Sequence, residues 1–183
     1  MNTPAAKFQL NGRDQAPDLV AGQRLSEVLR ETLGQRDVKI GCDAGDCGAC
    51  TVLIDGTPVC ACLTPVHQAV GRNVETVQGL HANDPLAAQL MQSFLDHGAS
   101  QCGICTPGMM VSAIALLREV PKPSQEQVEN ALGGVLCRCT GYRKIIDAVM
   151  GAPAMAVAQT GQVGEAIQHV DCLLYTSPSP RDS

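Results

Sequence analysis

The sequence has few aromatic residues, little excess charge and no long apolar segment. Its 183 residues include no tryptophan, two tyrosines and two phenylalanines, and the net charge is −5. This acidic balance argues against a basic, phosphate-seeking surface, so we expect no nucleic-acid partner. No apolar run approaches the roughly 18 residues of a membrane helix, so we expect no membrane insertion. The first residues show no charged segment followed by an apolar stretch, which predicts no secretory signal and a cytoplasmic location.

Cysteine is abundant by contrast, with ten residues. In a chain without an export signal, cysteines are more typical of metal ligands or catalytic groups than of disulfides. The hydrophobic fraction of 45% suffices for a core. The length allows one large domain or two small ones and argues against a large multidomain enzyme.

The segment over residues 1–80 reads as short strands around one helix. The turn pairs Asn11-Gly12 and Asp55-Gly56 predict two hairpins. Apolar residues at helical spacing predict a helix over 24–33, and a closing strand is expected at 74–77.

The segment over residues 81–150 reads as helices. Helix starts are indicated at Asp84-Pro85 and Thr106-Pro107, and Ser124 with Gln127 forms a capping-box pattern. A last helix is expected over 142–149, so four short helices predict a small bundle. The whole chain is therefore predicted to be an α+β protein with two subdomains.

The residues after 150 are expected to add little to the fold. Residues 151–171 read as a linker of small residues. Residues 172–183 fit nothing before them and look like a translated sequencing adapter, so we exclude them from the fold prediction. The alternative for them is a genuine disordered tail.

The first cysteine group is spaced C-x4-C-x2-C-x11-C and comprises Cys42, Cys47, Cys50 and Cys62. Its first three members match the plant-type [2Fe–2S] spacing. Four thiolates must converge on two irons, so the loop has to fold around the cluster, and its glycines provide the permissive backbone. Cys60 competes with Cys62 for the fourth position, and spacing alone leaves that choice open. Otherwise Cys60 is a small, half-buried strand residue.

The second cysteine group is spaced C-x2-C-x31-C-x-C and comprises Cys102, Cys105, Cys137 and Cys139. Each pair lies beside a predicted helix start, where free N–H groups favour thiolates. Structural zinc also takes four cysteines, but the first group fits its usual spacing poorly. A Rieske centre needs two histidine ligands, and no histidine lies within two residues of a cysteine.

The sequence around these cysteines resembles the iron–sulfur domain of the molybdenum hydroxylases, a family that includes xanthine dehydrogenases, aldehyde oxidoreductases, and carbon monoxide and nicotinate dehydrogenases. The matching segments are residues 39–52, 101–109 and 136–142, in the family's order. The resemblance implies a ferredoxin-like β-grasp subdomain over 1–80 and a four-helix bundle over 81–150, each with one [2Fe–2S] cluster.

The resemblance also implies roles for single residues. It favours Cys62 over Cys60, because the family's fourth cysteine precedes a leucine, as Cys62 does. Gln101 and Cys139 match positions that contact the pterin of a molybdopterin cofactor held by a partner subunit or domain.

The function implied by the resemblance is an electron relay. Electrons leave the molybdenum site one at a time, pass the cluster of the helical subdomain and then that of the ferredoxin-like subdomain, and reach FAD on a partner or another acceptor. No catalytic residue is expected on this chain, since the substrate (xanthine, aldehyde, carbon monoxide or N-heterocycle) is oxidised elsewhere. A weak similarity of residues 163–171 to the start of a molybdopterin-binding chain leaves a truncated fusion and a separate small subunit both open. The alternative function is a structural or regulatory metal-binding module without a redox partner.

Overall fold

The computed structural model of the chain describes residues 7–20 and 22–158. Its strands are β1 (Phe8–Leu10), β2 (Arg13–Gln15), β3 (Thr51–Ile54), β4 (Thr57–Cys60) and β5 (Asn73–Glu75). Its α-helices are α1 (Leu25–Glu27), α2 (Val77–Asn83), α3 (Pro85–Asp96), α4 (Thr106–Glu119), α5 (Gln125–Leu132) and α6 (Arg143–Ala158). A π-helix, η1 (Val28–Thr32), continues α1, and a short 3-10 helix, η2 (Val66–Ala69), precedes β5. The expected mixture of sheet and helix is confirmed.

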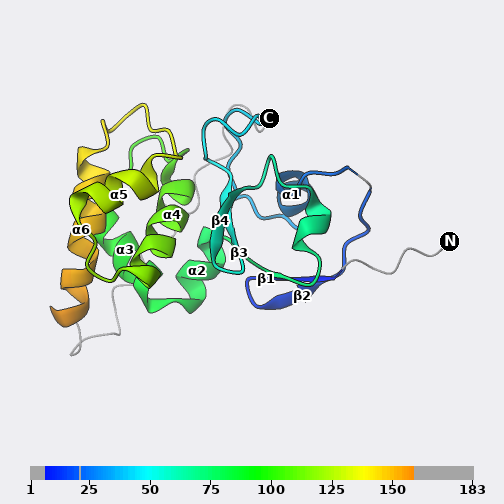
Figure 1. Cartoon of the computed structure of the whole chain (residues 1–183), viewed down its shortest axis with the longest axis horizontal. Coiled ribbons are helices and arrows are strands. Elements are labelled where there is room, and N and C mark those ends of the chain that lie inside the picture. The colour runs from blue at the N-terminus through cyan, green and yellow to red at the C-terminus, as the bar shows by residue number, and fades with distance from the viewer. Residues whose placement is uncertain (1–6, 21, 159–183) are drawn as a thin grey trace.

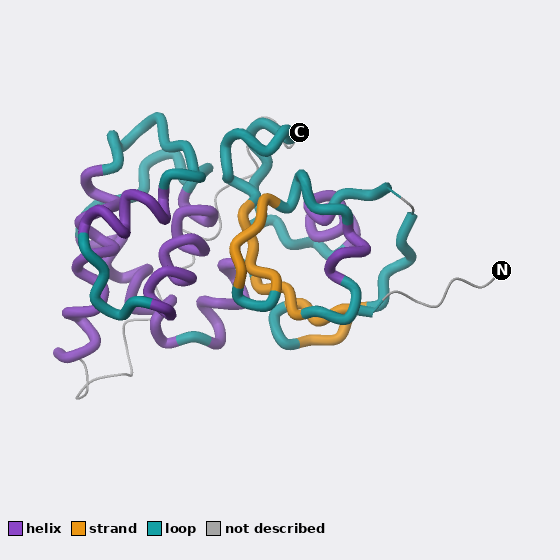
Figure 2. The backbone as a smooth tube through the Cα atoms, in the orientation of Figure 1, coloured by secondary structure: helices purple, strands orange, loops and turns teal. Residues whose placement is uncertain are grey.

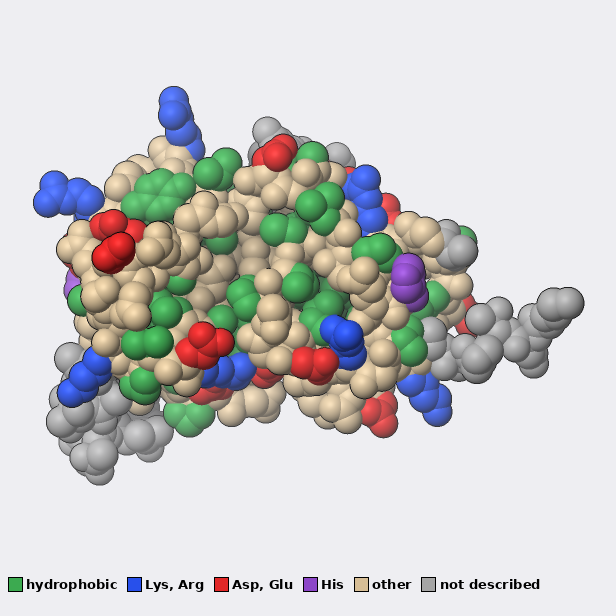
Figure 3. Space-filling model, in the orientation of Figure 1, with side chains coloured by type: hydrophobic (Ala, Val, Ile, Leu, Met, Phe, Trp, Pro, Cys, Tyr) green, Lys and Arg blue, Asp and Glu red, His purple; other side chains and the backbone are tan. Residues whose placement is uncertain are grey.

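The sheet and the later helices lie side by side (Figure 1, Figure 2). We call residues 7–75 the sheet half and residues 77–158 the helical half. Among the described residues, every helix is too short or too polar to cross a membrane. On the face shown in Figure 3, acidic and basic side chains are interspersed over both halves.

The five strands form one sheet in the order β2-β1-β5-β3-β4, in which β1 and β5 are parallel and the other pairs antiparallel. Both predicted hairpins are confirmed. Asn11 and Gly12 have φ values of 52° and 77°, and Asp55 and Gly56 have 50° and 82°. Positive φ at both central residues is typical of type I′ turns, whose twist matches that of paired strands.

The predicted helix over 24–33 forms as α1 and η1, with Leu25 and Leu29 fully buried. The closing strand ends earlier than expected, because α2 begins at Val77. This helix was not predicted, since it is short and contains Gly79. The glycine is needed for packing: a Cβ there would lie 2.1 Å from Cγ of Asn11. The same Asn11 accepts a hydrogen bond from the Thr76 N–H at 2.9 Å, so the first hairpin turn is tied to the start of α2.

The helix starts in the helical half are confirmed. Asp84 accepts a hydrogen bond from the Leu86 N–H at 2.9 Å, and Ser124 forms its capping box with Gln127. The end of α6 corrects the prediction, because the chain stays helical to Ala158 although residues from 151 onward read as a linker.

A linker was predicted from residue 151 onward because Gly151 and Pro153 are poor helix formers. Gly151 lies where α6 passes close to α3, since a Cβ at this position would lie 3.1 Å from Cε1 of His97. Nearby, Ser93 donates a hydrogen bond to the Ala148 carbonyl at 2.6 Å. Tertiary packing therefore holds a sequence of low helix propensity in the helix. Residues 159–171 and the expected foreign tail, 172–183, lie outside the described residues.

Strand β3, which lies between β5 and β4, is buried on both faces of the sheet. Val52 and Ile54 of β3 belong to the apolar cluster of the sheet half, whereas Leu53 between them belongs to that of the helical half. Successive strand residues point to opposite faces, so β3 contributes to both cores. At the junction of the two halves, Arg118 of α4 forms an ion pair with Glu75 of the sheet half at 3.1 Å and one with Asp84 of the helical half at 2.9 Å. Residues 80 and 81 lie inside α2, and the division into subdomains at that point stays a prediction.

Candidate metal centres

The first cysteine group lies beside β3 and β4 in the sheet half. Cys42, Cys47 and Cys50 follow one another in the loop before β3, and Cys62 follows β4. The Cys47 N–H donates to Sγ of Cys42 at 3.3 Å, and the Cys62 N–H donates to Sγ of Cys50 at 3.4 Å. These contacts join the four residues as two pairs, Cys42 with Cys47 and Cys50 with Cys62.

The loop that carries the first three cysteines turns repeatedly through left-handed backbone conformations. Asp43, Gly45 and Gly48 have φ values of 54°, 82° and 67°. This winding aims backbone N–H groups at sulfur, because the Ala44 N–H also donates to Sγ of Cys42 at 3.3 Å. Hydrogen bonds from the backbone of Ala44 and Cys47 lower the pKa of the Cys42 thiol to about 7. Such hydrogen bonds favour the thiolate, which is the form that binds metals.

The buried member of this group behaves differently. Burial raises the pKa of the Cys50 thiol to about 12. A buried thiol of this kind loses its proton when a metal cation binds, since the positive charge replaces the missing solvation.

Cys60, the competing residue, lies close to the same loop. Its thiol is half-buried and lies 4.0 Å from the carbonyl oxygen of Gly45. Burial, followed by the neighbouring Cys62, raises the pKa of this thiol. Both cysteines are thus near the loop, but Cys62 is the one that pairs with Cys50.

The second cysteine group is assembled from two distant segments. Cys102 and Cys105 precede α4, while Cys137 and Cys139 lie between α5 and α6. The sulfur atoms of Cys102 and Cys139 are 3.4 Å apart, and the Cys105 side chain contacts that of Cys137. Each pair therefore takes one cysteine from each segment. Burial raises the pKa of the Cys105 thiol to about 12.

The segment around Cys137 is held by residues to which the sequence analysis gave no role. Tyr142 accepts a hydrogen bond from the Cys137 N–H at 2.9 Å and donates one to the Val135 carbonyl at 3.2 Å. The Thr140 hydroxyl lies 3.1 Å from Sγ of Cys137. Burial opposes the Cys137 thiolate, but hydrogen bonds from Thr140, Cys139 and Cys105 together outweigh it and lower the pKa of this thiol. The sequence feature that could have indicated these contacts is the run Thr140-Gly141-Tyr142, directly after Cys139.

Part of the second cysteine group is exposed to solvent. Cys102 and Cys139 are exposed, as is Gln101. Cys50 and Cys62 of the first group are buried.

Each cysteine group joins its four members as two pairs. Within residues 7–20 and 22–158, no three His, Cys, Asp or Glu side chains converge on one point as ligands of a single ion. Four cysteines in two pairs are what a binuclear cluster requires, since each iron takes two protein ligands. Both groups have this arrangement.

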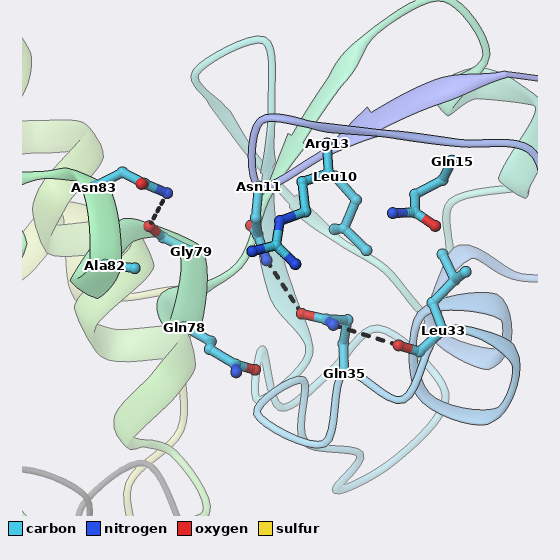
Figure 4. A pocket seen from close by; sticks show the side chains of 10 residues that line it. All are labelled: Leu10, Asn11, Arg13, Gln15, Leu33, Gln35, Gln78, Gly79, Ala82 and Asn83. Atoms are coloured by element: carbon cyan, nitrogen blue, oxygen red, sulfur yellow. Dashed lines mark hydrogen bonds between the residues drawn. The ribbon is translucent and has the colours of Figure 1, made fainter.

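A cavity of about 370 Å³ lies away from the thiols, between the first hairpin and α2 (Figure 4). Arg13 and the amide side chains of Asn11 and Gln35 line part of it, and Asn11 donates to Gln35 at 3.1 Å. No cysteine is among its lining residues, so it belongs to neither group.

Comparison with protein families identifies both halves. A family model described as a 2Fe-2S iron-sulfur cluster binding domain matches residues 8–77, and one described as a [2Fe-2S] binding domain matches residues 76–150. The chain is 42% identical over 156 residues to the nicotine 6-hydroxylase small subunit of Paenarthrobacter nicotinovorans, covering 85% of this chain and 89% of that subunit.

Two solved structures are similar over most of the chain. Quinoline 2-oxidoreductase from Pseudomonas putida 86 matches with a TM-score of 0.77 and 43% identity, over 86% of this chain and 96% of that one. Aldehyde oxidoreductase from Desulfovibrio gigas matches with a TM-score of 0.76 and 35% identity, over 96% of this chain but 19% of that one.

The fold, the paired thiols and the two matched domains define an iron–sulfur protein of the [2Fe–2S] class. The chain belongs to the iron–sulfur subunits and domains of the molybdenum hydroxylase family. The resemblance seen in the cysteine motifs is thereby confirmed, and with it the expectation of an iron–sulfur component of an oxidoreductase.

Proposed function

We propose that this chain is an electron-transfer component that carries one [2Fe–2S] cluster in each half. The observation that carries the proposal is the pairing of eight cysteines into two groups of four. The ligands are Cys42, Cys47, Cys50 and Cys62 in the sheet half and Cys102, Cys105, Cys137 and Cys139 in the helical half. When bound, each cluster supplies a site that accepts and releases one electron at a time.

The two halves have different tasks in this proposal. The sheet half, with α1 and η1 against it, acts as a ferredoxin-like β-grasp unit, and helices α3 to α6 form a four-helix bundle. Backbone N–H groups of Ala44 and Cys47 stabilise the Cys42 thiolate, and Thr140 does the same for Cys137. Cys60 holds no iron.

The exposed surface of Gln101, Cys102 and Cys139 faces the partner that holds the molybdopterin cofactor. Gln101 and Cys139 contact the pterin there. The sheet half is on the outgoing side, toward an FAD-binding subunit or another acceptor. The family offers two arrangements for the partner, since the chain spans 89% of the nicotine 6-hydroxylase small subunit but 19% of the aldehyde oxidoreductase chain.

The deciding experiment is a metal count on anaerobically reconstituted protein. We expect about four irons and about four acid-labile sulfides per chain, with two distinguishable paramagnetic signals after reduction by dithionite. Zinc in place of iron, or a single signal, contradicts the proposal.

A redox titration distinguishes this proposal from the alternative function, a structural metal-binding module. A redox component takes up electrons reversibly at both clusters and returns to its oxidised spectrum without losing iron. A structural module releases iron or fails to reoxidise over repeated cycles. Iron content measured before and after the cycles distinguishes the two.

A further inference from the structure

The two cysteine-bearing loops touch each other through backbone atoms. A Cβ at Gly48, between Cys47 and Cys50, would lie 2.1 Å from the Gly134 carbonyl oxygen and 2.9 Å from Cα of Val135. A Cβ at Gly108 would lie 2.4 Å from the Gly48 carbonyl oxygen. We call this contact between the halves the seam; it consists of Gly48, Gly108, Gly134 and Val135, and its shortest approaches are to backbone atoms.

One hydrogen bond crosses the seam between the two groups. The Leu136 N–H, one residue before Cys137, donates to the carbonyl oxygen of Cys47 at 2.9 Å. A cysteine of the sheet half is thus joined to a cysteine of the helical half by a single hydrogen bond and one peptide unit. This is a short connection between groups that are far apart in sequence.

The Gly48 carbonyl is fixed in place. It accepts hydrogen bonds from the Thr51 hydroxyl at 2.6 Å and from the Thr51 N–H at 3.1 Å. A methyl group at position 108 therefore cannot be accommodated by rotating this carbonyl away. The added volume has to increase the distance between the Gly48 carbonyl and the first turn of α4.

Gly108 lies inside the first turns of α4, where alanine is more favourable by about 1 kcal/mol in helix propensity. A glycine inside a helix is typical of a close approach to other atoms. At Gly108 that approach is to the loop that carries Cys47. The residue thus weakens its own helix and permits contact between the halves.

We propose that Gly108, together with Gly48, sets the separation of the two clusters and is a positioning residue for the electron step between the halves. This inference rests on the proposed function. In the step, the iron bound in the helical half is oxidised by one electron and the iron bound in the sheet half is reduced by one. No bond forms or breaks and no proton moves. The electron comes from the molybdenum-bearing partner or, in the test, from a solvated electron produced by pulse radiolysis.

The test compares Gly108→Ala with Gly134→Ala in the full, reconstituted chain. Gly134 lies in the same seam, but a Cβ there would meet nothing within 4 Å, so its variant is a matched control. After a substoichiometric pulse, the rate at which the electron equilibrates between the two clusters is measured. We expect a several-fold slower rate in Gly108→Ala and the wild-type rate in Gly134→Ala.

A second measurement reports on the seam itself. Hydrogen exchange of the Leu136 amide should be faster in Gly108→Ala and unchanged in Gly134→Ala, because only the first variant opens the seam. Iron content and melting temperature are recorded for both variants, since a purely structural role would change these instead of the rate.

The inference is overturned if Gly108→Ala equilibrates as fast as Gly134→Ala. It is also overturned if Gly108→Ala loses a cluster that Gly134→Ala retains, because Gly108 would then be a folding residue. Failure of the proposed function looks different, since the wild-type chain would then lack its two signals.

Discussion

The two cysteine groups of this chain are built in opposite ways. In the sheet half, one loop contributes three cysteines within nine residues, and the loop's own N–H groups point at sulfur. In the helical half, each cysteine pair joins segments that lie on either side of α4 and α5. The first group is therefore a local structure, whereas the second depends on the packing of the helices.

The two groups also differ in exposure. Cys50 and Cys62 are buried, while Cys102 and Cys139 are exposed. A surface site is accessible to a partner, and a buried site is insulated from solvent. In the proposed relay, this difference makes the helical half the one that a partner can approach more closely.

The largest expected effect is the loss of one cluster without the other. Cys47→Ser removes a ligand of the sheet half only, so we expect about half of the iron and one of the two paramagnetic signals to disappear. Iron analysis and electron paramagnetic resonance measure this. Cys60→Ser is the control and should retain both signals. Loss of both signals in Cys47→Ser would falsify the assignment of one group to each half.

The next effect tests how strongly the second group depends on helix packing. Phe94 of α3 is 1% exposed in the core of the helical half, and Phe94→Ala should cost about 3–5 kcal/mol of unfolding free energy. The signal of the helical half should then vanish at a lower temperature than that of the sheet half. Thermal unfolding followed by both signals measures this difference.

The matched control for that variant is Leu95→Ala, because Leu95 is the neighbouring residue and is 39% exposed. Its effect on unfolding should be within about 0.5 kcal/mol. If Phe94→Ala lowered the temperatures at which the two signals vanish by the same amount, the two halves would unfold as one cooperative unit.

The smallest expected effect concerns the ion pairs at the junction. Arg118→Met removes the contacts to Glu75 and Asp84, and these partly exposed pairs contribute about 1 kcal/mol or less. The loss should shrink at high salt, because salt screens such charges. Denaturant unfolding at low and high salt measures it.

The control for the junction is Arg72→Met, whose exposed ion pair with Asp55 at 3.8 Å lies within the sheet half. It should change stability less than Arg118→Met at low salt. Equal effects would mean that the junction pairs add nothing specific to the contact between the halves.

Features that depend on neighbouring residues were predictable from the sequence. The turn pairs Asn11-Gly12 and Asp55-Gly56 tolerate positive φ, and Asp84 and Ser124 cap helices through their own side chains. The cysteine spacing indicated Cys42, Cys47 and Cys50 as neighbours around one cluster, because they match the plant-type [2Fe–2S] spacing, but it left the choice between Cys60 and Cys62 open. These signals hold over a few residues and need no knowledge of the rest of the fold.

The sequence analysis missed structural features that depend on contacts between distant segments. Helix α2 contains Gly79 because the Asn11 side chain, from a distant turn, occupies the space that a Cβ would need. Helix α6 continues past Gly151 because α3 packs closely there. The hydrogen bonds of Tyr142 to the segment of Cys137 depend on the turn at Gly141, and the spacing does not show where its hydroxyl points.

The sequence by itself determined the family of this protein, since its motifs over residues 39–52, 101–109 and 136–142 resemble those of the iron–sulfur domains of the molybdenum hydroxylases. Only the tertiary structure decided how the two groups meet. The contact depends on backbone atoms of Gly48, Gly108 and Leu136, which are brought together by the packing of β3 against α4. Distances between remote backbones follow from the packing of whole elements, and no local pattern of residues encodes them.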